Sequence, residues 1–263
     1  METVTHDGRE TAYRIVGEAA DGPGVLYVHG SGGSHRVWGQ QYGPEGPSRP
    51  AIALDLSGHG DSADVETEAG PETLDAYADD VLAVAKATDA SVLVGNSLGG
   101  AVVLQVLLER TDSVEGAVLL GSGAKLVVAE DVRRWLADDF ERAVDGLHGT
   151  DLFFHDAPAS HVENSKAEMR DVGRAVAERD FLTCHVFDVR ERLGEIDVPV
   201  LALCGEHDRL TPPDYHEYLA EHLPDGRMGT VPGAAHLAMI ESPGAVNDAI
   251  EQFLADLDHH GAP

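Results

Sequence analysis

Short, continuously apolar segments recur along the chain and alternate with segments of helical periodicity. The apolar segments are 25–29, 51–55, 91–95, 116–121 and 198–203, and the helical ones are 72–87, 98–109, 213–222 and 243–257. Continuous apolar character is typical of strands that a parallel sheet buries on both faces. This alternation predicts an α/β fold, in which helices flank a mostly parallel, twisted sheet. Segments 3–6 and 13–16 predict an antiparallel edge hairpin that turns at Asp7-Gly8.

The stretch 125–194 departs from this alternation. It carries helix candidates at 130–146 and 164–178 but no strong strand. We therefore expect a helical cap over 125–194, inserted into one α/β core made of 1–124 and 195–263. A chain of 263 residues is long enough for one such domain with a small insertion.

Cysteine use and hydropathy favour an intracellular protein. The two cysteines, Cys184 and Cys204, form no paired framework, so buried free thiols are expected. The first residues carry neither the basic nor the apolar region of a signal peptide, and no apolar run reaches the ~18 residues of a membrane-spanning helix. These features predict a cytoplasmic protein with no membrane span.

The chain is strongly acidic, with 47 Asp and Glu against 18 Lys and Arg and a formal net charge of −29. Its lysines are Lys86, Lys125 and Lys166. Such self-repulsion weakens a compact state in dilute salt, whereas at ~1 M salt the screening length falls to ~3 Å. The composition resembles that of proteins from salt-accumulating halophiles, with an ordinary acidic protein as the alternative. In either case the charge disfavours nucleic acid as a partner.

The motif Gly95-Asn96-Ser97-Leu98-Gly99 matches G-x-S-x-G and lies between a predicted strand and a predicted helix. A sharp strand-to-helix turn forces the serine into a strained backbone conformation and lifts its hydroxyl above the sheet. The backbone approaches closely two positions before and after the serine, so only small residues fit there. We therefore expect Ser97 to be a nucleophile; a plain turn serine is the alternative.

A glycine-rich segment at 29–33 (His-Gly-Ser-Gly-Gly) follows the first predicted parallel strand. Glycines leave backbone N–H groups free to point at a negatively charged oxygen. The N–H groups of Ser31 and Leu98 would form such an oxyanion hole. A phosphate-binding loop is the alternative, but no G-K-[ST] sequence follows and the nearest basic residue is Arg36.

A general base and an acid that orients it are expected late in the chain. His236 lies in a loop between a short strand and the last helix, and Asp208 follows the apolar segment 198–203. The 28 residues from Asp208 to His236 allow one helix and one strand between them. Ser97, Asp208 and His236 would then all lie at the carboxyl ends of parallel strands, in the order that the nucleophile-elbow fold requires. Taken singly, a surface-loop histidine and a turn or helix-capping aspartate are the alternatives.

With these motifs, the chain resembles the α/β-hydrolase fold superfamily over nearly its whole length. Four stretches carry the resemblance: 29–33, 55–62 (Asp-Leu-Ser-Gly-His-Gly-Asp-Ser), 95–100, and the loops of Asp208 and His236. The resemblance implies a serine hydrolase that acts on a small-molecule ester through an acyl-enzyme intermediate, with no cofactor and no metal.

Within the superfamily the chain looks like the small capped serine carboxylesterases. Segments 121–126 and 188–193, at the two ends of the expected cap, are typical of that group. Asn96 is a departure, because histidine is the commoner neighbour of the serine. The resemblance also makes 55–62 a structural turn, so that His59 is expected to be a scaffold residue.

Apolar side chains in and near the expected cap are candidates for a substrate pocket, with ordinary core packing as the alternative for each. The candidates are Trp38, Trp135, Phe140, Phe153, Phe154, Phe181, Phe187 and Met239. Such a pocket predicts a hydrophobic substrate of small to medium size. The sequence leaves the oligomeric state open.

Other activities of the same fold stay open from the sequence. A carbon–carbon bond hydrolase or a lactonase would use the same Ser97, Asp208 and His236, and perhydrolase activity could accompany an esterase. A haloalkane dehalogenase or an epoxide hydrolase is disfavoured, because those enzymes have aspartate at the position of Ser97. The intact triad also disfavours a non-catalytic ligand receptor.

Overall fold

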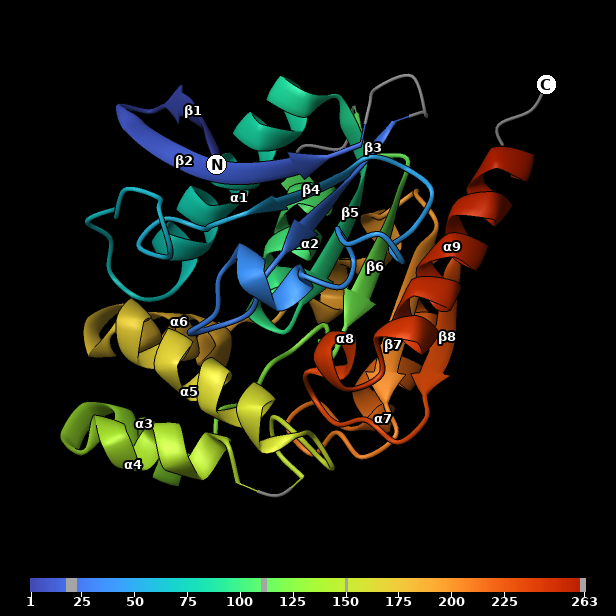
Figure 1. Cartoon of the computed structure of the whole chain (residues 1–263). Coiled ribbons are helices and arrows are strands. Elements are labelled where there is room, and N and C mark those ends of the chain that lie inside the picture. The colour runs from blue at the N-terminus through green and yellow to red at the C-terminus, as the bar shows by residue number, and fades with distance from the viewer. Residues whose placement is uncertain (18–22, 110–112, 150, 261–263) are drawn as a thin grey trace.

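The computed structural model describes residues 1–17, 23–109, 113–149 and 151–260. Within them, an eight-stranded sheet of order β1-β2-β4-β3-β5-β6-β7-β8 forms the centre (Figure 1). The strands are β1 (Glu2–His6), β2 (Arg9–Val16), β3 (Gly24–Val28), β4 (Ala51–Leu54), β5 (Ala90–Asn96), β6 (Gly116–Leu120), β7 (Val200–Gly205) and β8 (Gly226–Val231). β2 pairs antiparallel with β1 and β4, and the other pairs are parallel. The predicted mostly parallel sheet is therefore confirmed.

The first two strands form the hairpin predicted at Asp7-Gly8, with His6 opposite Arg9 in the register. Asp7 (φ 46°) and Gly8 (φ 78°) both have positive φ, as the two-residue turns that match strand twist require. β1 is thus an edge strand, joined to the rest of the sheet through β2.

Helices flank both faces of this sheet (Figure 1). Those outside the segment between β6 and β7 are α1 (Pro71–Thr88), α2 (Leu98–Glu109), α7 (Pro213–His222), α8 (Ala238–Glu241), α9 (Pro243–His260) and the short 3-10 helix η2 (His35–Trp38). The bounds of α2 and α7 agree with those expected from the sequence, whereas α9 ends at His260 rather than at 257. Among the described residues, no helix is both long and apolar enough to cross a membrane.

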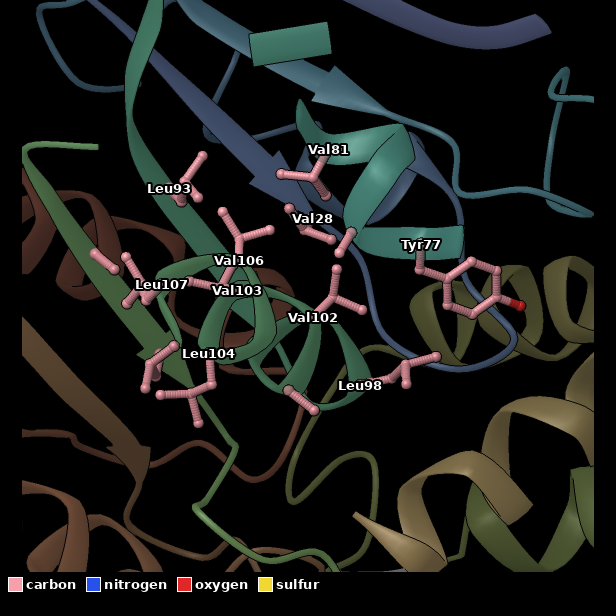
Figure 2. Packing of buried hydrophobic residues seen from close by; sticks show 14 of the residues in the cluster. Val28, Tyr77, Val81, Leu93, Leu98, Val102, Val103, Leu104, Val106 and Leu107 are labelled. Atoms are coloured by element: carbon pink, nitrogen blue, oxygen red, sulfur yellow. The ribbon is translucent and has the colours of Figure 1, made fainter. Parts of the chain in front are cut away.

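Buried side chains form one cluster on each face of the sheet, because successive residues of a strand point to opposite sides. Leu26 and Val28 belong to the cluster shared with α1 and α2, and Val25 and Tyr27 belong to the one shared with α9. Figure 2 shows buried side chains of α2 packed against α1 and against the strands. Four consecutive residues of α2, at 101–104, are all buried, so α2 is buried on nearly every side.

Between β6 and β7 the described residues form a helical insertion. Its helices are α3 (Glu130–Asp138), α4 (Phe140–Leu147), α5 (Ala159–Val172), α6 (Arg174–Val186) and the 3-10 helix η3 (Arg190–Glu195). Helices α3 to α6 gather at the end of the sheet toward which the β6, β7 and β8 arrows point (Figure 1). The two ends of the insertion lie side by side, since Leu126 N–H donates to Phe187 O (3.3 Å) and Val189 N–H donates to Ala124 O (2.8 Å).

The two helices expected at 130–146 and 164–178 are each divided in the structure. The first is interrupted at Asp139, whose backbone is not helical (φ −149°, ψ 80°) and whose side chain accepts a hydrogen bond from Arg142 N–H (3.2 Å) at the start of α4. The second is interrupted at Gly173, which has a φ of 86°. Helical periodicity continues across both residues in the sequence, so it did not reveal these breaks.

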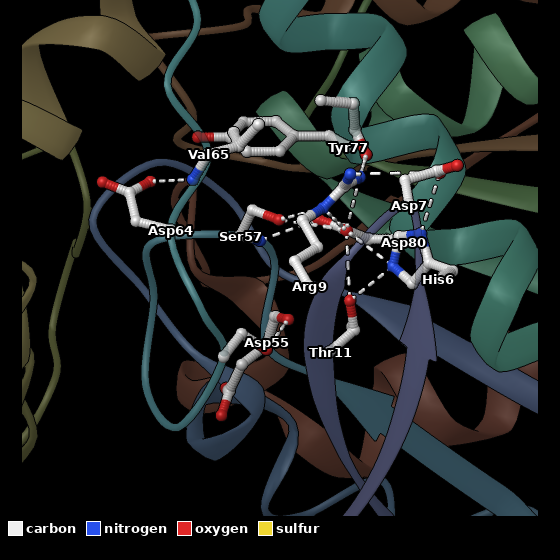
Figure 3. Close-up of polar contacts among 12 residues, drawn as sticks. His6, Asp7, Arg9, Thr11, Asp55, Ser57, Asp64, Val65, Tyr77 and Asp80 are labelled. Carbon is white, nitrogen blue, oxygen red and sulfur yellow. Dashed lines mark hydrogen bonds and ion pairs between the residues drawn. The ribbon is translucent and has the colours of Figure 1, made fainter.

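A buried carboxylate, Asp80 of α1, joins the N-terminal hairpin to the core (Figure 3). Its Oδ1 accepts hydrogen bonds from Arg9 Nε (3.1 Å), Thr11 Oγ1 (3.1 Å) and Ser57 Oγ (3.0 Å), and its Oδ2 accepts one from Ser57 N–H (2.8 Å). His6 Nε2 lies 3.1 Å from the same carboxylate. A buried charge is tolerated when it is paired and hydrogen-bonded in this way.

A second buried carboxylate, Asp180 of α6, attaches the helical insertion to the core. Its Oδ2 lies 2.9 Å from His59 Nε2, and its Oδ1 accepts a hydrogen bond from Tyr77 O–H (2.7 Å). His59 and Asp180 are both almost completely buried. His59 therefore has a structural partner.

Substitution of Gly99 is expected to destabilise the protein strongly. A Cβ at this position would lie 2.6 Å from His29 O and would overlap Val28 O, because α2 starts directly against the end of β3. Gly99→Ala should lower the free energy of unfolding by about 3 kcal/mol. Gly244→Ala is the control, since a Cβ there meets nothing within 4 Å, and it should change stability by less than about 1 kcal/mol. Denaturant unfolding measures both; equal stability of the two variants would contradict the packing argument.

Buried His216 of α7 should make stability depend on pH. Burial lowers the pKa of His216 to about 4, and its Nε2 accepts a hydrogen bond from Ser122 N–H (3.2 Å). In the unfolded chain the histidine pKa is ~6.5. Between pH 6.5 and pH 4 the unfolded state therefore binds more protons than the folded state, so the free energy of unfolding falls as the pH falls. His216 therefore accounts for about 2 kcal/mol of the stability lost between pH 7 and pH 5.

The measurement is denaturant unfolding of His216→Asn at both pH values in constant salt. The variant should lose less stability between pH 7 and pH 5 than the unaltered protein does. His222→Asn, which changes an exposed histidine at the end of the same helix, should leave the pH dependence unchanged. An unaltered pH dependence in His216→Asn would rule out this role.

Candidate active site

Ser97 occupies the bend between β5 and α2. It is a non-glycine residue in the left-handed region, with a φ of 55°. Ser97 N–H donates to Leu120 O (3.0 Å), and Ser97 O accepts hydrogen bonds from Gly100 N–H (3.0 Å) and Ser122 Oγ (2.8 Å). Neighbouring structure thus holds the strained residue in place, as is typical of strained backbone at functional sites.

The bend depends on glycines where two segments of backbone meet. A Cβ on Gly95 would lie 2.6 Å from Gly100 N, in the first turn of α2. Gly30 is also close, since its Cβ would lie 3.0 Å from Ser97 Cβ. The chain before the bend and the loop after β3 therefore both pass directly beside the serine.

His236 and Asp208 form a buried pair in the loops after β8 and β7. His236 Nδ1 lies 2.8 Å from Asp208 Oδ2, and the two residues are only 3% and 2% exposed. Asp208 Oδ1 accepts hydrogen bonds from Leu210 N–H and Thr211 N–H (both 2.9 Å), and Oδ2 accepts one from Thr211 Oγ1 (2.8 Å). The carboxylate is thus held by four donors.

The electrostatics of this pair favour a charged acid. Burial on its own raises the pKa of Asp208, but the adjacent His236 imidazole and the hydrogen bonds from His236 and Thr211 hold that pKa below its usual value. The ionised carboxylate accepts a hydrogen bond from Nδ1–H at Oδ2, which fixes the tautomer of His236. Among the described residues the ring is hydrogen-bonded only through Nδ1, so Nε2 has no protein partner there.

Two residues connect this pair to the serine bend. Asn96 Nδ2 donates to Leu120 O (3.1 Å) and to His236 O (3.3 Å). Gly121 has a φ of 55°, and a Cβ on it would lie 3.1 Å from His236 Nδ1 and 3.2 Å from Asp208 Oδ2. Both residues therefore lie where β5, β6 and the His236 loop converge.

Ser97 and His236 line the same cavity, which has a volume of about 380 Å³. Of the two predicted oxyanion donors, Ser31 lies in its wall, and Leu98 directly follows Ser97 as the first residue of α2. Most of the remaining wall is apolar and comes from the helical insertion. Its charged residues are Asp131, Glu168 and Arg209.

The loop from His29 to Gly33 is fixed by its first residue. His29 Nδ1–H donates to Gly30 O (2.9 Å), and His29 Nε2 accepts a hydrogen bond from Leu56 N–H (3.0 Å). Burial lowers the pKa of His29 to about 4, so the ring is neutral near pH 7. His29 therefore holds the loop without adding charge. The described residues contain no group of His, Cys, Asp and Glu that could hold a metal ion.

The predicted pocket residues divide into two groups. Trp135, Phe153 and Phe181 line the cavity. The other candidates lie outside its wall: Trp38, Phe140, Phe154, Phe187 and Met239. These side chains pack into the core instead, four of them fully buried or nearly so and Phe140 partly buried. Trp38, for example, packs on Tyr27 with ring centroids 5.1 Å apart.

Sequence reasoning did not identify Thr211 or the role of Asn96. Thr211 follows Asp208 by three residues, and a hydroxyl at that spacing is a recognisable turn signal that accompanies an aspartate. The motif shows Asn96 only as a departure from the commoner histidine. Its hydrogen bond to the His236 main chain depends on the position of a residue 140 positions away, which a local motif does not contain.

Comparison with known proteins finds similarity to hydrolases. Residues 25–249 match the model of the alpha/beta hydrolase family. A pimeloyl-[acyl-carrier protein] methyl ester esterase of Neisseria meningitidis is 31% identical over 81% of this chain and 86% of its own length. RutD of Agrobacterium fabrum, named as a candidate carbamate hydrolase, is 29% identical over 91% of this chain and 95% of its own.

Comparison with solved structures finds similarity to an esterase. A thermophilic esterase superposes with a TM-score of 0.85 at 30% identity and covers 97% of both chains. The family match spans more than half of the residues, and it confirms the resemblance inferred from the motifs. This chain therefore belongs to the alpha/beta hydrolase family.

Proposed function

We propose that this protein is a serine hydrolase that cleaves carboxylic ester bonds of small to medium hydrophobic substrates. The observation that carries the proposal is the strained Ser97 in the same cavity as His236, whose Nδ1 is paired with buried Asp208. Relatives named as esterases, at about the same chain length, support ester cleavage in particular.

In the proposed reaction His236 Nε2 takes the hydroxyl proton of Ser97 as Oγ attacks the ester carbonyl carbon. The carbon–oxygen bond to the alcohol then breaks, and His236 returns the proton to the departing alkoxide. A water molecule repeats the attack on the acyl-enzyme, which releases the acid and restores Ser97. Asp208 stays ionised throughout and stabilises the imidazolium.

The negative charge on the carbonyl oxygen would be received by the main-chain N–H groups of Ser31 and Leu98. Leu98 N–H belongs to the first turn of α2, where the helix dipole also favours negative charge. Ser31 lies in the loop whose conformation His29 fixes. Two such donors would contribute strongly to stabilising the transition state, because removing one typically lowers the rate by ~10²–10³-fold.

We propose that residues 125–194 act as a cap on a core formed by 1–124 and 195–263, and that the cap selects the substrate. Its helices supply most of the apolar wall, including Trp135 and Phe181. A cavity of about 380 Å³ suits a ligand of modest size.

Replacing the nucleophile tests the proposal directly. The protein should hydrolyse p-nitrophenyl esters in molar salt, and Ser97→Ala should lower kcat by at least about 10³-fold while the melting temperature stays close to that of the unaltered protein. Ser91→Ala, a serine at the start of the same strand, should keep full activity. Full activity in Ser97→Ala would refute the role of this serine.

The same assay separates the alternatives. Lactones, carbamates and carbon–carbon bond substrates should be poorer than a matched ester of equal chain length. Turnover of a lactone alone would favour a lactonase. Turnover of none of these substrates would favour a non-catalytic receptor. A series of acyl and alcohol chain lengths would then define the limits of the cavity.

We further propose that the protein works in the salt-rich cytoplasm of a halophile. The net charge of −29 supports this, because such repulsion needs screening. The melting temperature should fall when the protein is dialysed from molar KCl to about 0.1 M, where the Debye length rises to ~10 Å. Sucrose should not replace the salt if screening is the cause. Equal melting temperatures with and without salt would remove the halophile proposal and leave the enzyme proposal intact.

A further inference from the structure

The segment 151–156, between α4 and α5, lies against the loop that carries His236; it is called the strap below. Its main chain accepts two hydrogen bonds from that loop. His236 N–H donates to Leu152 O (3.3 Å), and Leu237 N–H donates to Phe153 O (3.0 Å). The backbone of the histidine is therefore held by the helical insertion as well as by the core.

The ring of Phe153 stacks on the imidazole of His236. The ring centroids are 5.9 Å apart and the planes differ by 11°, within the range of favourable aromatic pairs. The hydrogen bond to Asp208 fixes Nδ1, but one such bond leaves the imidazole able to rotate about it. A flat apolar neighbour restricts that rotation and so fixes the direction of Nε2.

Phe153 is itself held from another side. His148 packs edge-on against it, with ring centroids 4.9 Å apart and planes at 82°. His148 is fixed in turn by contacts to Val144 O (2.7 Å) and Ser165 Oγ (2.9 Å), on α4 and α5. The orientation of the phenyl ring is thus set by the helices that also form the cavity wall.

One carboxylate joins the strap to the residue before His236. Glu241 Oε1 accepts hydrogen bonds from His155 N–H (2.8 Å) and Asp156 N–H (2.9 Å), and its Oε2 accepts one from Ala235 N–H (2.7 Å). Glu241 belongs to α8 and lies outside the cavity wall. It therefore connects the strap to the histidine loop without facing the cavity.

The strap also contacts the loop of the acid. The rings of His155 and His207 stack with centroids 3.6 Å apart, and Asp151 lies 3.6 Å from Arg209. These two partners flank Asp208 in the sequence. The strap thus contacts both loops of the Asp208–His236 pair.

We propose that Phe153 is a positioning residue for His236, through which the strap sets the direction of the base toward Ser97. The proposal rests on the proposed function and goes beyond it, because it assigns part of the geometry of the base to the helical insertion. Phe153 exchanges no proton and acts only through the imidazole.

Phe153→Leu keeps apolar volume but removes the flat face. We expect kcat for a short p-nitrophenyl ester to fall by about tenfold, which exceeds any rise in KM from the altered wall, because the lost interaction matters when the proton is transferred. Phe153→Tyr keeps the face and should restore most of kcat. The matched control is Phe181→Leu, at another phenylalanine of the cavity wall; it should raise KM and leave kcat unchanged.

Glu241→Gln is the second variant, because it weakens the strap without altering the cavity wall. It should also lower kcat with little change in KM. A change in KM alone for Phe153→Leu, as in the control, or an unaltered kcat in both Phe153→Leu and Glu241→Gln, would overturn the proposal.

A failure of the proposed function would be recognised separately, since the unaltered protein would then hydrolyse no ester. The NMR resonances of the His236 ring test the positioning role without activity. Phe153→Leu should shift and broaden them by removing the phenyl ring current and the restriction on rotation, whereas Phe181→Leu should leave them in place. Unchanged resonances in Phe153→Leu would also overturn the proposal.

Discussion

The bend at Ser97 is the constraint on which the site depends. A serine at a φ of 55° is unfavourable by itself, so the surrounding structure must hold it there. α2 supplies that support, because it is buried on nearly every side and cannot shift without disturbing the core. The hydrogen bonds from Gly100 and Ser122 to Ser97 O then leave the residue no room to relax.

Sheet order explains how the other two residues reach the bend. β5, β6, β7 and β8 are neighbours in the sheet and run parallel, so their carboxyl ends lie along one edge. Ser97 follows β5, Asp208 follows β7 and His236 follows β8. Asn96 crosses from the first of these strands to the His236 loop, and Gly121, after β6, leaves the space in which the pair fits.

Local patterns predicted the parts of the molecule that depend on local chemistry. The buried strands, the bounds of α2 and α7, and the hairpin at Asp7-Gly8 follow from apolar periodicity and turn residues. The G-x-S-x-G motif placed Ser97 on its bend because the close backbone approach demands glycine.

What the sequence did not reveal depends on distant residues. An aromatic residue near the insertion is equally suited to the core and to a cavity wall, and only the packing of helices decides between them. Trp38 and Met239 are therefore in the core while Phe153 and Phe181 face the cavity. The breaks at Asp139 and Gly173, and the amide of Asn96 beside His236, are set by tertiary contacts in the same way.

The position of the insertion in the chain has a mechanical consequence. It leaves the sheet after β6 and returns before β7, so in the chain it lies between the strand beside β5, which Ser97 follows, and the strand that Asp208 follows. Its entry and exit are held together by main-chain hydrogen bonds, and α6 is attached through Asp180, while the strap reaches the His236 loop. The same helices line the cavity and hold His148, whose ring packs on Phe153. If Phe153 positions His236 as proposed, substitutions confined to the insertion alter both the shape of the cavity and the orientation of the His236 ring, while the main chain at Ser97, Asp208 and His236 stays at the ends of the strands.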